Sequence, residues 1–293
     1  MKISISIILF ILLTSTTIII VKGYDEQEFQ FFYLEYEPKQ CLTLFCPQYL
    51  ATIANTGHSY NIVDIKVPSF LKKENYFPNT LNLAVYGKIV SITTESISYY
   101  NLYISDIFES LAQTETLSQV LEPLYSISFS GLDCKRSIND CPQFIISMIN
   151  NNNFTNSTLI NSFIEPYSST INYFDREWYY DRLVRENDTQ VLVQGEFSND
   201  NRDFKITSSY ILLENSKCQD VVSMCHESNP ITVYHRDHNR CLKPQFCIDN
   251  VGPCLTKDIP NCPLGYKLSY HPSDMFGCPK YYCDPYFLPV IRI

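Results

Sequence analysis

Short runs in which apolar and polar residues alternate dominate the chain and predict β-strands. Tyr60–Val67 and Leu81–Ile89 both show this period of two residues, and aromatic and β-branched side chains fill them, as is typical of strands. Helical spacing is rarer. The leucines of Ser110–Leu121 fall on about one helical face, whereas Ile171–Glu186 is compatible with a short helix or an aromatic-rich loop. The pattern predicts a mainly β protein, with an α+β fold as the alternative.

A ten-residue block that begins Cys-Pro-Gln-aromatic occurs twice, at Cys46–Asn55 and at Cys141–Asn150. Before each block lie an extended aromatic-rich run and a further cysteine, Cys41 or Cys134, and after each block comes a strand pattern that contains a glycine. Several matches in the same order predict one supersecondary unit used twice. We therefore expect two related antiparallel β units, at residues 24–121 and 122–214.

The close spacing of these cysteines predicts two local disulfides. Four to six intervening residues can fold back far enough to join Cys41 to Cys46 and Cys134 to Cys141, because a disulfide needs Cα atoms only about 4.4–6.8 Å apart. The alternative is a crosslink between the units, such as Cys41 to Cys134. Peptide mapping of the unreduced protein distinguishes the two.

The carboxyl end, residues 215–293, is predicted to be a small disulfide-rich module. Its cysteines are Cys218, Cys225, Cys241, Cys247, Cys254, Cys262, Cys278 and Cys283. Eight cysteines allow 105 pairings, so the sequence assigns none of them. Zinc sites usually contain C-x2-C pairs, which are absent among these eight, so we expect neither a metal nor another cofactor. The basic segment His235–Lys243 is expected to be a solvated loop, and the alternative is a patch that contacts an acidic glycan or partner.

The amino end predicts secretion. Residues 1–23 have the plan of a signal peptide, with Lys2, an apolar run and small residues before a cut after Gly23; a signal anchor is the alternative. No membrane segment is expected after cleavage. Secretion agrees with the 12 cysteines, since disulfides persist outside the cytosol. Three N-x-[ST] motifs predict glycans at Asn153, Asn156 and Asn187.

Composition narrows the function further. The 293 residues carry a formal net charge of −9, so nucleic acid is not an expected partner. Aromatic residues make up 14% of the chain, enough to exclude a disordered chain. There is no nucleophile elbow, phosphate loop, metalloprotease motif or dinucleotide fingerprint in the sequence.

Two resemblances follow from these motifs. The paired units, over about Phe29–Leu213, resemble a family of secreted cysteine-paired domains of unknown function from predatory soil bacteria and social amoebae. This resemblance implies no reaction and no catalytic residues. The segments Cys262–Tyr266 and Gly277–Cys283 are similar to extracellular modules of the antistasin or von Willebrand type C kind. That resemblance implies protease inhibition or protein binding.

We therefore expect a secreted, non-catalytic protein that binds an extracellular protein or a glycan through aromatic β surfaces. One alternative is a protease inhibitor, which a protruding disulfide-braced loop between Cys262 and Cys278 would favour. The other is a hydrolase with an unrecognised site, which a cleft lined by acidic residues or histidines would favour.

Overall fold

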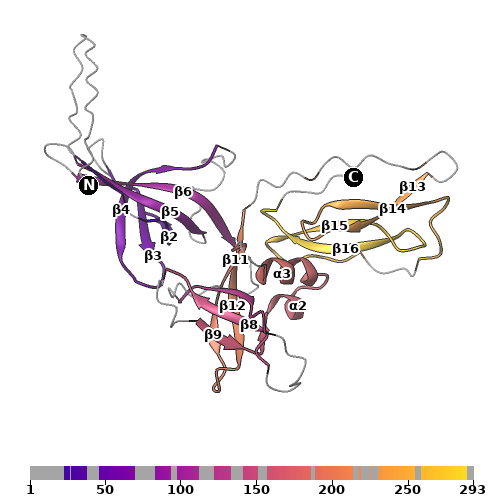
Figure 1. Ribbon diagram of the computed structural model, residues 1–293. Helices are drawn as coiled ribbons and strands as arrows, with labels where there is room; N and C mark the ends of the chain where they lie inside the picture. The colour runs from indigo at the N-terminus through magenta and orange to yellow at the C-terminus, as the bar shows by residue number, and fades with distance from the viewer. Residues whose placement is uncertain are drawn as a thin grey trace, which may run out of the picture.

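The computed structural model describes residues 23–26, 28–37, 46–69, 83–93, 98–111, 122–132, 141–150, 157–185, 189–213, 218, 225, 230–254 and 259–288 (Figure 1). Strands dominate these residues, and most neighbouring strands are antiparallel. The prediction of a mainly β protein with a disulfide-rich carboxyl end is confirmed.

The first five long strands close into a barrel. They are β2 (Gln30–Tyr36), β3 (Tyr49–Ile53), β4 (Ser59–Lys66), β5 (Leu83–Thr93) and β6 (Ser98–Ser110). Neighbours around the barrel follow the order β2-β3-β4-β6-β5 and back to β2, with β4 and β6 parallel and all other pairs antiparallel. A short strand, β1 (Gly23–Glu26), pairs with the outer part of β5. Numbered within the barrel, this is the 1-2-3-5-4-1 order of the OB-fold, a five-stranded Greek-key barrel.

The second half of the chain repeats the same strand order. Its strands are β7 (Tyr125–Phe129), β8 (Phe144–Met148), β9 (Ser157–Ile160), β10 (Ser162–Ile164), β11 (Val191–Phe197) and β12 (Asp203–Leu212). Strand β9 pairs with β8, and β10, one residue further along, pairs in parallel with β12, so β9 and β10 together take the place of β4. Two helices, α2 (Tyr167–Thr170) and α3 (Arg176–Leu183), lie between β10 and β11.

Each barrel contains a glycine at a β-bulge. The register shifts at Gly87 in β5 and at Gly195 in β11. A Cβ atom at either position would collide with a backbone oxygen, of Tyr103 and Lys205 respectively. The backbones approach so closely that only glycine fits.

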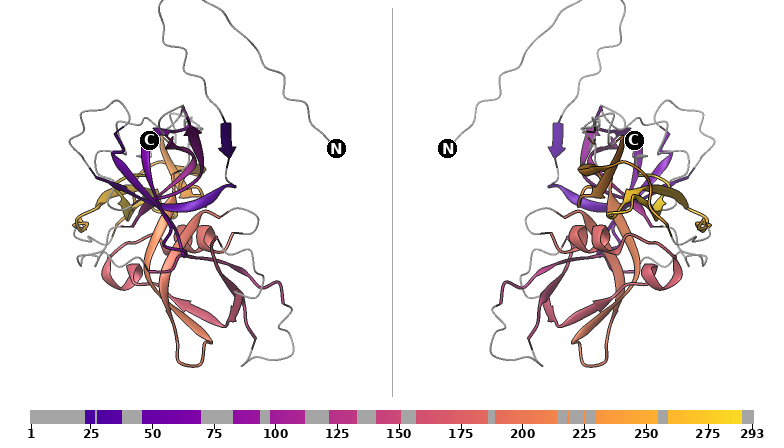
Figure 2. Two further views of the ribbon diagram at one scale, coloured as in Figure 1. Left: turned by 90° about the vertical axis from the view of Figure 1, so that its left-hand side faces the viewer. Right: turned by 90° about the vertical axis from the view of Figure 1, so that its right-hand side faces the viewer.

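The two barrels form one continuous sheet because β6 pairs with β12. Residues 108–110 run antiparallel to residues 210–212, and the first barrel lies above the second in both views of Figure 2. Between them lies a small apolar cluster that includes Phe108, Leu192 and Tyr210. Two asparagines bond the barrels reciprocally across this joint: the Asn55 side chain bonds the backbone of the second barrel, and the Asn150 side chain bonds the backbone of the first.

We call the carboxyl-terminal region, residues 218–288, the tail, and its described residues form two hairpins. They are β13 (Ile231–Arg236) with β14 (Leu242–Ile248), and β15 (Tyr266–Ser273) with β16 (Cys278–Pro285). Each hairpin is held by two disulfides with the same connectivity, first to third and second to fourth: Cys218–Cys241 and Cys225–Cys247, then Cys254–Cys278 and Cys262–Cys283. In each set, 15 residues separate the second cysteine from the third.

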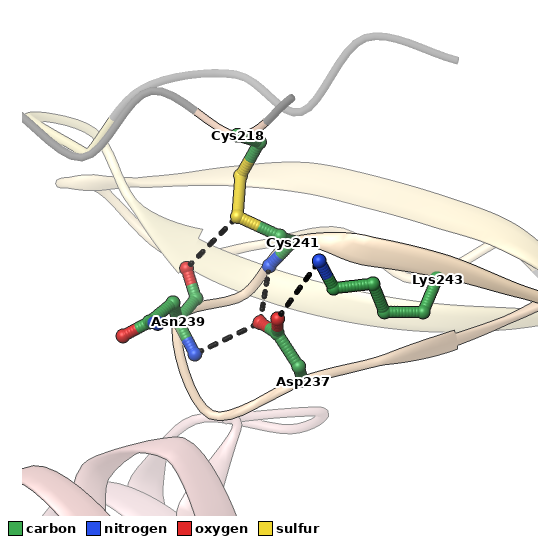
Figure 3. The surroundings of a disulfide bond; sticks show 5 residues. All are labelled: Cys218, Asp237, Asn239, Cys241 and Lys243. Carbon is green, nitrogen blue, oxygen red and sulfur yellow. Dashed lines mark hydrogen bonds and ion pairs between the residues drawn. A yellow bond between two sulfur atoms is a disulfide. The ribbon is translucent and has the colours of Figure 1, made fainter. Parts of the chain in front are cut away.

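The turns of the two hairpins are also alike. Asp237 accepts hydrogen bonds from the backbone N–H groups of Asn239 and Cys241, as Figure 3 shows beside the Cys218–Cys241 disulfide. Asp274 likewise accepts them from the N–H groups of Phe276 and Cys278. The residue before the third cysteine has a left-handed backbone in both turns, with φ +66° at Arg240 and +67° at Gly277.

The structure corrects or sharpens three local expectations. Ser110 ends strand β6, so a helix beginning there is wrong; residues 112–121 lie outside the described residues. Within the ambiguous segment 171–186, α3 forms from Arg176 to Leu183, and the Asp175 side chain caps it by accepting from the Trp178 N–H at 3.1 Å. The strand expected at 81–89 begins at Leu83 and continues to Thr93, since its outer part pairs with β1.

Candidate functional site

A groove follows α3 and is lined mainly by residues of the segment 173–185 and of the tail. We call it the α3 groove. It begins at the start of α3 as a cleft of about 1020 Å³, continues as a polar pocket of about 220 Å³, and ends beside Val184 as a shallow hollow of about 450 Å³. The three parts are neighbours, because the cleft and the pocket share lining residues such as Lys280 and Tyr282, and the pocket and the hollow share Asp181 and His238.

Aromatic rings line the cleft from both sides. Tyr173 comes from the loop between α2 and α3 and is 40% exposed, and Phe276 comes from the turn of the second hairpin and is 49% exposed. The ring of Tyr281 lies 6.4 Å from that of Tyr173 and 5.9 Å from that of Tyr270. Side chains with an apolar body and a hydroxyl tip are typical of recognition surfaces.

The backbone of Tyr173 is strained. Its φ is +64°, an uncommon value for a bulky residue. Its carbonyl oxygen accepts a hydrogen bond of 3.0 Å from the Cys283 N–H, which ties this loop to the tail. Strained residues cluster at functional sites, so Tyr173 strengthens the assignment of a site to this groove.

A buried network of charges supports the groove from below. The Arg236 guanidinium lies 2.6 Å from Asp284 and 3.3 Å from Asp175, and Arg240 lies 3.0 Å from the other oxygen of Asp284. Burial alone would raise the pKa of Asp284, but the two guanidinium groups hold it below the ordinary value. The pKa of Asp175 is raised, because its burial outweighs the attraction of Arg236.

This network also positions the aromatic wall. The Arg236 guanidinium lies over the Tyr282 ring, 4.3 Å from its centre, and His271 stacks on the same ring at 5.6 Å. Burial lowers the pKa of His271, which keeps its ring neutral at neutral pH. Tyr282 thus contacts one group from each of the two hairpins, Arg236 and His271.

The basic segment is therefore not a solvated loop, and that expectation is wrong. Arg236 and Arg240 have side chains only 3% and 4% exposed, whereas His235 and His238 are exposed. The sequence did not show that Asp284, some 45 residues away, would supply the charge that permits this burial.

The structure leaves several predicted site residues untested. Asn153, Asn156 and Asn187 lie outside the described residues, as do Cys41 and Cys134. Cys46 and Cys141 are both disulfide-bonded. The local pairing of each with its upstream neighbour stays a prediction.

Two features bear on the alternative functions. Acidic residues and histidines line the polar pocket, the feature expected of a hydrolase: Asp175, Glu177, Asp181, Asp237, His235, His238 and His271. Between Cys262 and Cys278 the chain forms strand β15 and a tight turn closed by the Gly277 N–H on the Asp274 carbonyl oxygen. Two points in this interval are strongly exposed, Leu264 at 97% and Met275 in the turn at 72%.

No three His, Cys, Asp or Glu side chains of the described residues are grouped so that they could hold a metal ion. In the same part of the chain, no helix is long and apolar enough to cross a membrane.

Comparison with known proteins yields one distant relative. The chain is 29% identical, over 296 aligned positions, to an uncharacterised protein of Dictyostelium discoideum, and the alignment covers 96% of each chain. No protein-family model matches the chain, and no solved structure matches it. The relative and the disulfides fit a non-catalytic extracellular protein, and no family is assigned.

Proposed function

We propose that the protein is secreted and non-catalytic, and that it binds an extracellular protein or glycan in the α3 groove. The observation that carries this proposal is the cleft. It combines exposed aromatic rings from two parts of the chain, a strained tyrosine at its edge and a wall braced by disulfides. Ligand sites are commonly concave, preformed and lined by aromatic groups with a few polar ones.

Secretion belongs to the same proposal. The disulfides support it, since such bonds persist in oxidising compartments. The signal peptide at residues 1–23, the three glycans and the duplication of the β unit remain predictions. The matching strand order of the two barrels supports the duplication.

The test is retention of native extracellular material by the purified secreted protein. Wild-type protein and the variant Tyr281→Ala are immobilised and exposed to the extracellular medium. We expect the wild type to retain a protein or glycan that the variant retains less well, because Tyr281 lines the cleft and its ring lies 6.4 Å from that of Tyr173. The control is Tyr103→Ala, which removes a tyrosine that is 37% exposed on the first barrel, away from the groove. Equal retention by all three proteins would contradict the proposal.

A second candidate function is hydrolysis in the polar pocket, which the acidic residues and histidines of its lining favour. Asp175 has a pKa raised by burial, a property shared by many general acids. Turnover of glycoside, ester or peptide substrates that is lost in His238→Ala would support this candidate. Absence of turnover, together with ligand retention, would leave the binding function alone.

A further inference from the structure

Strand β16 borders the cleft of the α3 groove with its edge rather than with one of its faces. The consecutive residues 278–282 of this strand all line the cleft. Successive side chains of a strand point to opposite faces, so what these residues share toward the cleft is the backbone at the edge of the strand. Within the described part of the chain, β16 pairs with β15 and with no other strand.

The register of the hairpin shows which backbone groups point out of this edge. In an antiparallel pair, opposite residues alternate between pairs that exchange two hydrogen bonds and pairs that exchange none. Pro272 lies opposite Pro279, and since proline has no N–H group, this pair exchanges none. Tyr281 lies two positions further along, opposite Tyr270. It therefore directs its N–H and carbonyl groups outward, away from β15.

A hydrogen bond at the next outward position agrees with this alternation and places the edge at the cleft. Cys283 donates its N–H to the Tyr173 carbonyl oxygen at 3.0 Å, and Tyr173 lines the cleft. The outward groups of Tyr281 and the carbonyl group of Pro279 follow on the same edge, and no described residue bonds to them from outside the hairpin. The edge thus offers one donor and two acceptors, beginning where Tyr173 ends.

The cleft has room for a single extended segment. A residue in a packed strand takes up about 160 Å³, the product of a rise of about 3.3 Å, a strand spacing of about 4.8 Å and a sheet spacing of about 10 Å. The volume of about 1020 Å³ therefore holds about six such residues. The edge strand of a folded second copy carries a neighbouring strand beside it, and two strands of this length exceed that volume. A flexible segment of another protein fits the cleft better.

The side chains around the cleft favour an uncharged, apolar segment. Rings of Tyr173, Phe276 and Tyr281 line it, together with three carboxylates and two cations, from Asp175, Glu177, Asp274, Arg176 and Lys280. Two of these charges have partners outside the lining, since Asp175 lies 3.3 Å from Arg236 and Arg176 lies 3.9 Å from Glu165. Opposite charges are present in nearly equal number, so neither a strongly acidic nor a strongly basic segment is favoured.

We propose that the cleft binds an extended, uncharged segment of an extracellular partner protein, which joins the β15–β16 hairpin as a third strand along the outer edge of β16. The proposal rests on the proposed binding function and specifies the partner as a protein. In this mode of recognition main-chain hydrogen bonds give affinity and alternate side chains give specificity. Here the side chains on one face of the segment pack on the rings of Tyr281 and Tyr173.

The experiment selects linear peptides from a phage-displayed library on the immobilised full secreted chain, and measures the best binder by fluorescence anisotropy. Copies of that peptide methylated at one backbone nitrogen at a time then test the main-chain bonds. Methylation should weaken binding about fivefold at every second residue of the paired stretch, because only alternate residues turn their N–H groups toward β16. A scan without this period of two would overturn strand addition.

Two variants separate the backbone of Tyr281 from its ring. Tyr281→Ala removes the ring and keeps the N–H, whereas Tyr281→Pro removes both and breaks no bond inside the hairpin, since Tyr281 and Tyr270 exchange none. The proline variant should bind the selected peptide about fivefold more weakly than the alanine variant, and the control Tyr103→Ala should bind as the wild type does. Equal binding by the two Tyr281 variants would overturn the proposal. If proline unfolds the tail, the methylated peptides decide.

Further outcomes distinguish this proposal from the proposed function. Retention of glycan alone from the extracellular medium, reduced in Tyr281→Ala, would overturn the peptide assignment and leave the binding function standing. Self-association of the chain that Tyr281→Pro abolishes would mean that a second copy covers the edge, and would also overturn the assignment. No selected peptide and no retained material would overturn both.

Discussion

The reciprocal asparagines between the barrels allow a quantitative test of how the two halves are joined. The Asn150 Nδ2 group donates to the carbonyl oxygens of Phe31 at 2.7 Å and Ala54 at 3.0 Å, and Oδ1 accepts from the Phe31 N–H at 2.8 Å. The replacement Asn150→Ala removes all three bonds. At a net value of about 1 kcal/mol each, the loss lowers the free energy of unfolding by about 3 kcal/mol.

Backbone conformation adds a second cost. Asn150 has φ +56°, and a left-handed backbone costs an alanine roughly 1–2 kcal/mol. The total destabilisation expected for Asn150→Ala is therefore about 4–5 kcal/mol. The matched control is Asn201→Ala. Asn201 has φ +55° in an exposed turn, so its replacement carries the backbone cost alone.

The first barrel contributes the corresponding asparagine, Asn55. Asn55, with φ +68°, donates to the Leu124 and Ile149 carbonyl oxygens and accepts from the Leu124 N–H, each at 2.8 Å. Asn55→Ala should therefore match Asn150→Ala. Urea unfolding with the disulfides intact measures all three variants. If the two joint variants destabilise the protein no more than Asn201→Ala, the asparagines do not hold the barrels together.

Four other substitutions test the fold and its charges. Asp284→Asn removes the negative charge that pairs with the buried guanidinium groups of Arg236 and Arg240. Thermal unfolding should show that the free energy of unfolding falls by about 3–5 kcal/mol. A loss below about 1 kcal/mol, the value for an exposed ion pair, would contradict the role of this charge network. Burial raises the pKa of Glu109 to about 7, so the folded state binds the proton more tightly than the unfolded state and stability should fall as the pH rises from about 4.5 to 7; Glu109→Gln should weaken this dependence, and an unchanged pH profile would refute it. Gly87→Ala and Gly195→Ala should each destabilise a barrel, because the added Cβ atom collides with a backbone oxygen. Circular dichroism on heating measures the melting temperature of each variant, and a value equal to that of the wild type would contradict this expectation.

The strand pattern was visible in the sequence because half-buried strands alternate. The repeated block was visible as well, and its last residues, Asn55 and Asn150, occupy corresponding places at the joint. The sequence did not show that the strands close into barrels. It depends on parallel pairs such as β4 with β6, whose partners are more than 30 residues apart and carry no local signal.

The candidate site was harder to predict because it forms between the second barrel and the tail. Asp175, Arg236 and Asp284 come from three segments, and each alone reads as an ordinary surface charge. One signal was available. The spacing of 15 residues between Cys225 and Cys241 recurs between Cys262 and Cys278, and it would have indicated two similar hairpins in the tail.

The two hairpins of the tail differ at the left-handed position of their turns, and this difference contributes to the α3 groove. At the left-handed position of the turn the second hairpin has Gly277, which adopts positive φ without strain, whereas the first has Arg240. The backbone cost at Arg240 is offset by its side chain, which pairs with Asp284 of the second hairpin and lies 5.7 Å from the centre of the Trp178 ring in α3. One strained residue thus joins both hairpins to the helix beside which the groove lies. A glycine there would relax the turn and remove that connection, so the strain at Arg240, like that at Tyr173, belongs to the construction of the site.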